Sequence, residues 1–520
     1  MNADPLKVAL RADASVQIGL GHVKRCLALG QALQEIGAKV CLVARELGVD
    51  TASLAGSVSI EYFALPPSRA LTSTRTEGNE HQSWTNVGWM EDADATADAL
   101  SDWVPDLVVV DNYAFDARWH HAVATALNVR IAAVDDLGDR DLDVDWLIDH
   151  NHSTDHRAKY AGRVKPGTKM LCGPRYALLA PVYATAKRHV LRPCVESIGV
   201  FMGGTDSTGL SNDVVRACRE VAGFGGRIEV ATTRANPHLA ELQAACQRWP
   251  LTTLTIDAPD LAAFFAHHDL QIGAGGGATW ERCCIGAPTL AVICTDNQRI
   301  VIPALVQLDV LATTEPADDS TVELIGRAVS ALLQDSERRA TLSQRARLMV
   351  DGLGARRVAL HLAARTLVLR NASAADAELM YRWRNDSVTR AMSHDTEEIA
   401  WPAHVQWLDG ALADPTRRLL VASIGSIPVG VIRFDRHVEG QATVSLYLDP
   451  SLHGLGLGTA MLMAGERHAS ILPDRPARFQ ATVIEANAGS QRLFRSAGYA
   501  QDGERWTKTA ALALCGETPT

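Results

Sequence analysis

The sequence has 520 residues, which is enough for three or four domains of about 150 residues each, and its 47% hydrophobic and 21% charged residues are typical of globular proteins. A formal net charge of −10, with Lys and Arg scattered along the chain, lacks the basic surface that nucleic acid requires, so we expect no nucleic-acid partner. The N-terminus lacks a signal-peptide pattern, and no stretch approaches about 18 uninterrupted apolar residues, so we expect no membrane span and a cytoplasmic location.

The first part of the chain alternates short β-branched runs with amphipathic helical patterns. This alternation is typical of a doubly wound parallel sheet. We therefore predict a Rossmann-like lobe over residues 1–185, with strands within 7–12, 39–45, 106–113, 130–136 and 145–151.

The same pattern begins again after residue 185, and we predict a second Rossmann-like lobe over residues 186–363. Its strands are expected within 197–206, 227–233, 251–258, 270–277 and 289–296, followed by a helical tail. The two lobes should face each other across a cleft. Ligands of open α/β sheets bind beyond the carboxyl ends of the strands, so the strand-to-helix loops are the places to look for chemistry.

Residues 364–520 have a different character and indicate a separate α+β domain. A strand and a charged helix precede a hairpin candidate over 419–435, a strand over 441–450 and a glycine-rich turn into a helix.

The stretch "GLGHVKR" at residues 19–25 joins the first strand to a helix. Gly19 and Gly21 allow a tight turn, and His22 falls in the first turn of the helix, where the helix dipole favours a neutral imidazole. A neutral imidazole at a cleft can take a proton from water, but a helix cap or a phosphate contact explains His22 equally well from spacing alone. Asp13 is a candidate for orienting the water or the ring, or an ordinary polar loop residue.

The stretch "GAGGGATWERCC" in the second lobe indicates a diphosphate site. Gly276 and Gly277 expose backbone amides at a helix start, and Thr279 adds a hydroxyl donor. Glu281 is suited to accept hydrogen bonds from a ribose, although first-turn dipole compensation is an alternative. Asn297 and Gln298 follow the next strand and are expected at the same cleft, with a plain turn role as the alternative for Asn297.

The histidines and cysteines do not indicate a metal site. The ten cysteines show no paired ligand spacing. His150, His152 and His156 lie in a post-strand loop without the usual ligand partners, so we expect no metal.

Several motifs together resemble the PseG family of UDP-sugar hydrolases in pseudaminic acid biosynthesis. The resemblance covers about residues 5–360 and rests on these stretches: "RADASVQIGLGHVKRCLALGQAL", "VVVDNYAFDARWH", "AVDDLGDR", "GPRYALLAPVY", "GGTDSTGLS", "IGAGGGATWERCCIGAPTLAV" and "TDNQ". It implies a GT-B-like fold similar to MurG and hydrolysis of UDP-2,4-diacetamido-2,4,6-trideoxy-β-L-altropyranose to free sugar and UDP. It also implies that His22 is the catalytic histidine and that "GGGATWE" and "DNQ" hold the uridine diphosphate.

Physical chemistry then suggests how such a reaction would run. Backbone amides and the helix dipole near Gly276 stabilise the departing diphosphate, and His22 deprotonates a water that attacks with inversion. A GT-B glycosyltransferase with another acceptor and a nucleotide-sugar-binding pseudoenzyme are the alternatives.

The C-terminal domain resembles the GNAT acetyltransferase superfamily over about residues 366–510. The resemblance rests on "AELMYRWRNDSVTRAM", "HVQWL", "LYLDPSLHGLGLGTAML" and "RFQATVIEANAGSQRLFRSAGYA". It implies acetyl-CoA as co-substrate, with these candidate contacts: Leu448, His453, Gly454, Gly456, Gly458, Thr459, Asn487, Ser490 and Phe494. His453 stands where Arg or Gln is usual, and Phe494 replaces a common tyrosine acid. Tyr447 and Glu485 are candidates for acid and base.

The fusion of the two resemblances indicates consecutive reactions. In the pseudaminic acid pathway, a PseH-type GNAT enzyme acetylates the 4-amino group of the UDP-sugar before UDP is removed. The partner expected for both halves is therefore a UDP-activated amino sugar. Acetylation of protein amino groups is the alternative for the GNAT domain, and the sequence leaves the oligomeric state open.

Overall fold

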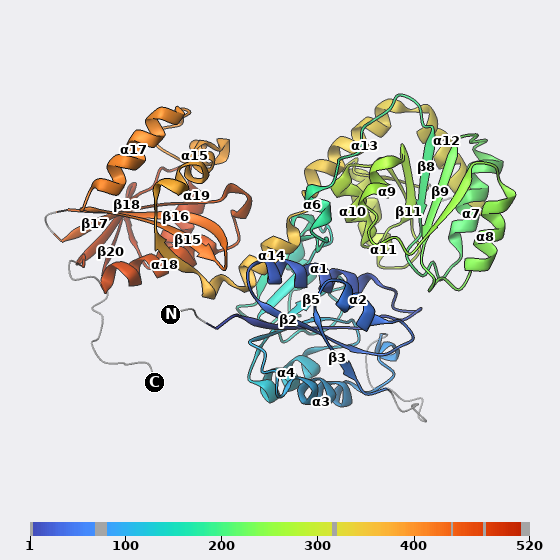
Figure 1. The fold of residues 1–520 in the computed structure, drawn as a ribbon, viewed down its shortest axis with the longest axis horizontal. Coiled ribbons are helices and arrows are strands. Elements are labelled where there is room, and N and C mark those ends of the chain that lie inside the picture. Colours follow the sequence, from blue (N-terminus) through green and yellow to red (C-terminus); the bar gives the residue numbers. More distant parts are fainter. Residues whose placement is uncertain (1–3, 68–80, 315–319, 438–439, 472–474, 511–520) are drawn as a thin grey trace. The chain divides into compact units, whose positions relative to one another are not determined.

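The protein is described by a computed structural model covering residues 4–67, 81–314, 320–437, 440–471 and 475–510. The chain forms two compact units, one built from Pro5–Gln34 with Ala38–Val358 and the other mainly from Ala359–Thr520. Both units are mixed α/β structures, and parallel sheets form the first of them, which confirms the predicted fold class (Figure 1).

The first lobe is a parallel sheet of seven strands in the order β3-β2-β1-β4-β5-β6-β7. Its central strands β1 and β4 are mostly apolar and buried, as expected of a sheet covered by helices on both sides, and their few charged residues include the buried Arg11 and Asp111. The strands are β1 (Lys7–Ala12), β2 (Lys39–Arg45), β3 (Glu61–Leu65), β4 (Leu107–Asp111), β5 (Arg130–Val134), β6 (Trp146–Asp149) and β7 (Lys169–Cys172). The sequence patterns missed β3 and β7, which pair at the two edges.

Helices cover both faces of this sheet, with α1 and α2 on one face and α3 and α4 on the other (Figure 1). The helical elements are α1 (Gly21–Glu35), α2 (Thr51–Ser57), η1 (Gln82–Trp84), α3 (Trp89–Leu100), α4 (Ala117–Leu127), α5 (His156–Lys159), η2 (Pro174–Tyr176) and α6 (Val182–Thr185).

The second lobe is a parallel sheet of six strands in the order β10-β9-β8-β11-β12-β13. The strands are β8 (Ser197–Phe201), β9 (Arg227–Thr232), β10 (Thr252–Ile256), β11 (Leu270–Ala274), β12 (Thr289–Val292) and β13 (Ala312–Thr313). One apolar cluster packs α9, α10 and α11 against one face, and a second packs α7, α8 and α12 against the other.

The helical elements of this lobe are α7 (Leu210–Arg216), η3 (Ala217–Val221), α8 (Leu239–Arg248), α9 (Ala262–His267), α10 (Ala278–Ile285), α11 (Gln298–Gln307), α12 (Thr321–Gln334), α13 (Ser336–Met349) and α14 (Gly354–Leu362).

The C-terminal unit is a sheet in the order β14-β15-β16-β17-β18-β20-β19, antiparallel except for the β17–β18 pair. Its strands are β14 (Val368–Asn371), β15 (Arg417–Ile424), β16 (Ile427–Arg436), β17 (Gln441–Leu448), β18 (Arg478–Thr482), β19 (Ala500–Asp502) and β20 (Arg505–Thr509). Its helical elements are η4 (Ala364–Thr366), η5 (Ala374–Asp376), α15 (Ala377–Asn385), α16 (Ser387–Ala391), α17 (Trp401–Ala413), η6 (Pro450–Leu452), α18 (Leu457–Ser470) and α19 (Ala488–Ser496).

Strand order marks one place in each lobe where a ligand is expected. In the first sheet β1 lies between β2 and β4, and in the second β8 lies between β9 and β11. The strand order therefore reverses between β1 and β4 in the first sheet and between β8 and β11 in the second. Ligands of open α/β sheets bind at such switch points, beyond the carboxyl ends of the strands. His22 follows β1, Asp111 ends β4, and the glycine loop follows β11.

A fully buried ion-pair network fixes the first lobe behind this edge. Asp92 of α3 accepts hydrogen bonds from Arg11 Nη2 at 2.7 Å, Arg45 Nη2 at 2.9 Å and Trp119 Nε1 at 3.1 Å. Burial opposes ionisation of Asp92, but the charges and hydrogen bonds of Arg11 and Arg45 prevail and lower its pKa. One carboxylate therefore holds two buried guanidinium groups.

We expect Asp92→Asn to lower the free energy of unfolding of this unit by about 3–5 kcal/mol, because two buried arginines lose their shared charge partner. The control is Asp98→Asn on the exposed face of α3. This variant should change the free energy of unfolding by less than about 0.5 kcal/mol. Thermal and urea unfolding measure the stability of both variants.

Because the folded pKa of Asp92 is lowered, the stability that ionised Asp92 contributes is complete above the carboxyl group's ordinary pKa. It is lost as pH falls through the folded pKa. Equal stability of the two variants at pH 7 would contradict this role.

Candidate functional site

His22 and Asp111 form a hydrogen-bonded pair at the switch point of the first lobe. Helix α1 begins at Gly21, so His22 lies in its first turn, and Asp111 is the last residue of β4. His22 Nδ1 lies 2.6 Å from Asp111 Oδ1. A carboxylate only accepts hydrogen bonds, so Nδ1 is the donor of this bond, and in the neutral form of the ring the lone pair is on Nε2. The His22 side chain is 10% exposed, whereas that of Asp111 is fully buried.

Arg25 holds the opposite side of Asp111. Its Nη2 donates to Oδ1 at 2.6 Å, and its Nε donates to Oδ2. Burial alone would raise the pKa of Asp111, but Arg25 and His22 outweigh burial and hold it far below its usual range. Asp111 is therefore a fixed anion that orients both side chains.

A second layer of polar groups supports this arrangement. Asp136 accepts a hydrogen bond from the Tyr113 hydroxyl and lies 3.9 Å from Arg25 Nη1. The Tyr113 ring contacts His22 edge-on, with centroids 4.7 Å apart, and the Trp84 ring lies 5.6 Å from His22 in a similar orientation. Aromatic edges thus restrict the orientation of the imidazole.

His150 is a second histidine beside the pair. It is buried, its Nε2 lies 3.4 Å from Arg25 Nη1, and burial together with Arg25 lowers its pKa to about 4. His150 is therefore neutral at neutral pH.

Asp13 lies close to the first-lobe edge but is occupied by neighbouring protein groups. Its Oδ1 accepts from Arg11 Nη1 at 2.5 Å and from the Arg45 backbone amide at 2.8 Å, and its Oδ2 accepts from Asn112 Nδ2 at 2.9 Å. These bonds tie the ends of β1, β2 and β4 together. They account for Asp13 without a bound water or sugar.

The glycine loop of the second lobe presents open backbone at a helix start. Gly276 and Gly277 are exposed, and α10 begins at the next residue, Ala278, without a side-chain cap. Among the hydrogen bonds of the described residues, none has the amide of Gly276 or Gly277 as donor. Two unpaired amides at the positive end of a helix favour an anion.

Thr279 and Glu281 are both engaged by neighbours on the second lobe. Thr279 is buried, and its hydroxyl accepts from Arg282 Nη2 at 3.1 Å. The Glu281 carboxylate accepts a hydrogen bond from the Tyr183 hydroxyl, and burial raises the pKa of Glu281. Glu281 therefore keeps an acceptor oxygen for a further donor.

Gln298 links the two loops of the second-lobe edge, whereas Asn297 does not. Gln298 Oε1 accepts from the backbone amide of Cys294 at 2.8 Å, and the Gln298 amide group lies against Gly275 and Gly276. Asn297 is exposed, and its Oδ1 accepts from the Thr295 hydroxyl at 2.5 Å. The structure thus brings Gly276, Gly277 and Gln298 together.

A hydrogen-bonded path connects the two edges within this unit. Trp280 Nε1, one residue after Thr279, donates to Asn151 Oδ1 at 3.0 Å, and Asn151 Nδ2 donates to Asp136 at 2.7 Å. Leu20 of the "GLGH" loop also lies against Gly204.

Sequence reasoning missed Asp111, Arg25, Tyr113 and Asp136 as site residues. Asp111 carried a usable signal, because it directly follows the buried run Val108–Val110 and so ends a central strand. Arg25 lies three residues after His22 and so shares its helix face.

The C-terminal unit places its glycine loop before α18. Gly454 and Gly456 have φ values of +82° and +72°, and α18 begins at Leu457 without a side-chain cap. Gly458 lies between Leu448 and Leu493. Thr459 is in the first turn of α18, and His453 directly precedes Gly454. The loop therefore turns its backbone toward the start of a long helix, which suits a diphosphate.

Strands β17 and β18 separate beside this loop. They pair only from Gln441–Arg478 to Thr443–Gln480, although β17 continues to Leu448. Beyond Thr443, β17 stays paired with β16 on one side, but its edge toward β18 is open. This open edge leaves backbone groups for an extended ligand such as a pantetheine arm. These features fit acetyl-CoA, which supplies the acetyl group when bound.

The remaining acetyl-CoA candidates have local partners. Asn487 caps α19, with its Oδ1 accepting from the Ser490 amide at 2.9 Å and its Nδ2 donating to the Met392 carbonyl at 3.0 Å. Phe494 is buried and packs against Tyr499, with ring centroids 4.9 Å apart. Capping and core packing account for Asn487 and Phe494 without a ligand. Tyr447 is partly buried and Glu485 is exposed.

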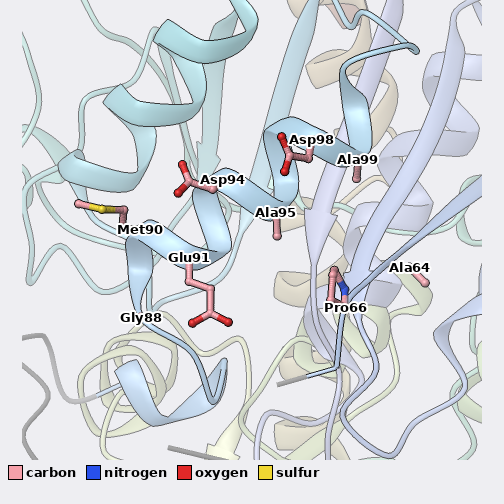
Figure 2. Close-up of a pocket in the computed structure, with 9 residues that line it drawn as sticks. All are labelled: Ala64, Pro66, Gly88, Met90, Glu91, Asp94, Ala95, Asp98 and Ala99. Atoms are coloured by element: carbon pink, nitrogen blue, oxygen red, sulfur yellow. The ribbon is translucent and has the colours of Figure 1, made fainter. Parts of the chain in front are cut away.

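An acidic hollow of about 930 Å³ lies elsewhere on the first lobe (Figure 2). It is lined by Ala64, Pro66, Gly88, Met90, Glu91, Asp94, Ala95, Asp98 and Ala99. None of these residues belongs to the sites above.

The described residues contain neither a metal-ligating cluster nor a membrane-spanning helix. No group of three or more His, Cys, Asp or Glu side chains in the described ranges is arranged to hold a metal ion. Within the same ranges, no helix has both the length and the apolar character needed to cross a membrane.

Comparison with known proteins identifies the two regions at a coarse level. Residues 366–500 match the family described as Acetyltransferase (GNAT) domain. The spore coat polysaccharide biosynthesis protein SpsG of Bacillus subtilis (strain 168) is 23% identical over 259 residues, which are 49% of this chain and 75% of that protein. The chain therefore carries a C-terminal GNAT acetyltransferase domain and is similar to a protein of sugar-polymer biosynthesis.

Two solved structures are similar to parts of the chain at low identity. A putative UDP-N-acetylglucosamine 2-epimerase from Listeria monocytogenes is 15% identical and covers 69% of this chain and 96% of its own, with a TM-score of 0.47. A spermidine N-acetyltransferase from Vibrio cholerae, solved with CoA and spermine, is 12% identical and covers 28% of this chain and 96% of its own, with a TM-score of 0.26.

We expect Gly456→Val to raise the Kd for CoA by at least about 10-fold, because a branched side chain strains the left-handed backbone at φ +72° and so distorts the loop. The control is Gly503→Val, which has φ +58° and lies in the β19–β20 turn. Calorimetric titration with CoA measures both variants, and the control should bind within about twofold of the unmodified protein. Equal loss in both variants would assign the effect to folding.

Proposed function

We propose that the N-terminal unit hydrolyses a UDP-activated amino sugar to UDP and free sugar, as the resemblance to the PseG family implies. The single observation that carries this proposal is the His22–Asp111 pair at the first-lobe switch point. The substrate implied by the resemblance is UDP-2,4-diacetamido-2,4,6-trideoxy-β-L-altropyranose.

In this proposal His22 is the general base. Asp111 binds Nδ1–H, so the Nε2 lone pair is the one that takes a proton from water. Asp111 also stabilises the imidazolium formed in that step, as the buried aspartate does in serine protease triads. Arg25 keeps Asp111 ionised and in place, so Asp111 and Arg25 are positioning residues.

The second lobe binds the leaving group. The exposed amides of Gly276 and Gly277 and the dipole of α10 stabilise the negative charge that develops on the diphosphate when the glycosidic bond breaks. Glu281 accepts hydrogen bonds from the ribose, and Gln298 holds the glycine loop in place. Water attacks from the side opposite UDP, so the sugar is released with inverted configuration.

We further propose that the GNAT domain transfers an acetyl group from acetyl-CoA to the 4-amino group of the UDP-sugar precursor. The glycine loop before α18 binds the CoA diphosphate in this proposal, and the open edge of β17 beyond Thr443, on the side of β18, binds the pantetheine arm. The two domains would then catalyse consecutive steps, with the C-terminal domain acting first.

We expect His22→Asn and Asp111→Asn each to lower kcat for UDP release by on the order of 10²–10⁴, with the Kd for UDP within about twofold. The double variant should be no slower than the slower single variant, because both changes disable one unit. The control His121→Asn, on the exposed side of α4, should keep full activity. UDP release is followed by NMR, which also reports the anomer formed. Additive losses in the double variant, or near-full activity of His22→Asn, would contradict the assignment.

Acetyl transfer should precede UDP release. With the UDP-4-amino sugar and acetyl-CoA, NMR should show CoA release first, followed by UDP and free diacetamido sugar. Without acetyl-CoA, UDP release should be slower by about 10-fold or more, because the pocket is matched to the acetylated sugar. CoA release without UDP release would restrict the activity to acetyl transfer. UDP release that requires an added acceptor would identify a glycosyltransferase.

A further inference from the structure

Arg282 is a buried cation that forms no ion pair with any described residue. It lies on α10, three residues after Thr279, and is 1% exposed. In the part of the chain that the structure describes, no carboxylate oxygen lies within ion-pair distance of its guanidinium. By contrast, the buried Arg11 and Arg45 both pair with Asp92.

The hydrogen bonds of Arg282 join the two ends of the glycine loop. Its Nη2 donates to the carbonyl of Ala274, the last residue of β11, at 2.8 Å, and to the Thr279 hydroxyl in the first turn of α10 at 3.1 Å. Its Nε and Nη1 are buried and have no hydrogen-bond partner among the described residues. The guanidinium is therefore bound to both ends of the loop but forms no ion pair among the described residues, and the Glu281 carboxylate acts on it only from beyond ion-pair distance.

The backbone makes room for this group at Gly273. A Cβ atom there would lie 2.5 Å from Arg282 Nη1 and 2.5 Å from the Phe201 carbonyl oxygen. The other side of the guanidinium faces the Phe265 ring, whose centroid lies 5.9 Å from Cζ. The group thus lies beneath the loop, between backbone carbonyl groups and the Phe265 ring.

Burial makes the charged form of Arg282 less favourable. Burial lowers the pKa of Arg282 to about 10, whereas the partners of Arg11 raise its pKa. A lone buried charge is unfavourable by several kcal/mol unless an opposite charge compensates it. The nearby exposed amides of Gly276 and Gly277 mark where an anion would supply that charge.

We propose that Arg282 is a positioning residue whose counter-charge is the diphosphate of the bound nucleotide, acting through the glycine loop. This inference rests on the proposed function, since it takes UDP as the ligand of that loop. The guanidinium fixes the loop ends and makes the electrostatic potential at the amides more positive. Because the guanidinium is buried, water screens its potential only weakly. The effect should act on the phosphates and leave the uridine part of the ligand unaffected.

The test compares UDP with uridine in the full-length protein by calorimetric titration. Arg282→Gln should raise the Kd for UDP by at least about 10-fold and the Kd for uridine by no more than about twofold. Arg282→Lys keeps a cation, and its Kd for UDP should stay within about threefold of the unmodified value.

The matched control is Arg339→Gln. Arg339 is 2% exposed, lies on α13 and donates only to the backbone carbonyls of Leu332, Leu333 and Pro193 among the described residues. This control should lower thermal stability without changing the ratio of UDP to uridine affinity.

Three results would overturn the inference. These are unchanged UDP affinity in Arg282→Gln, equal loss of UDP and uridine affinity, and a loss in Arg282→Lys as large as in Arg282→Gln. If Arg282→Gln does not fold, the ratio of UDP to uridine affinity in Arg282→Lys decides whether the inference holds. A failure of the unmodified protein to bind UDP would instead contradict the proposed function.

Discussion

The bond between His22 and Asp111 is the interaction on which the first-lobe site depends. It joins the start of α1 to the end of β4, the two elements that flank the switch point of the sheet. A carboxylate buried at a strand end is stable there only because Arg25 and His22 compensate its charge. The same compensation fixes the imidazole with one nitrogen bonded and the other available. The buried charge of Asp111 therefore explains both the position of Arg25 and the orientation of the His22 ring.

The two lobes handle charge in different ways. The first lobe buries several acids and bases as pairs, including the Arg11, Arg45 and Asp92 network behind the active edge. The second lobe presents backbone amides around a loop almost without side chains, and the buried guanidinium of Arg282, which forms no ion pair among the described residues, lies beneath that loop. A self-compensated lobe suits a base that must keep a fixed orientation. A lobe with uncompensated positive potential suits an anionic leaving group.

The C-terminal domain shows the limits of motif-based assignment. The glycine loop before α18 was predictable, because successive glycines between a strand and a helix require the left-handed backbone that the structure contains at Gly456. Asn487 and Phe494 were chosen by analogy, and their nearest partners in the structure are the start of a helix and the aromatic core. Short-range patterns identify backbone geometry more reliably than they identify what a side chain contacts.

The sequence by itself determined the parallel sheets, the strand-to-helix loops and the open glycine backbones, because these depend on local periodicity and on residues without side chains. It also placed His22 in the first turn of its helix. Only the tertiary structure decided that Asp111, 89 residues further along, binds His22, that Asp13 is occupied by Arg11 and Asn112, and that Arg282 forms no ion pair with any described residue. The edge strands β3 and β7 also emerged only in the folded sheet. The physical reason is that charge compensation in a protein interior depends on which groups share the same space, and the order of strands across a sheet sets this independently of their distance along the chain.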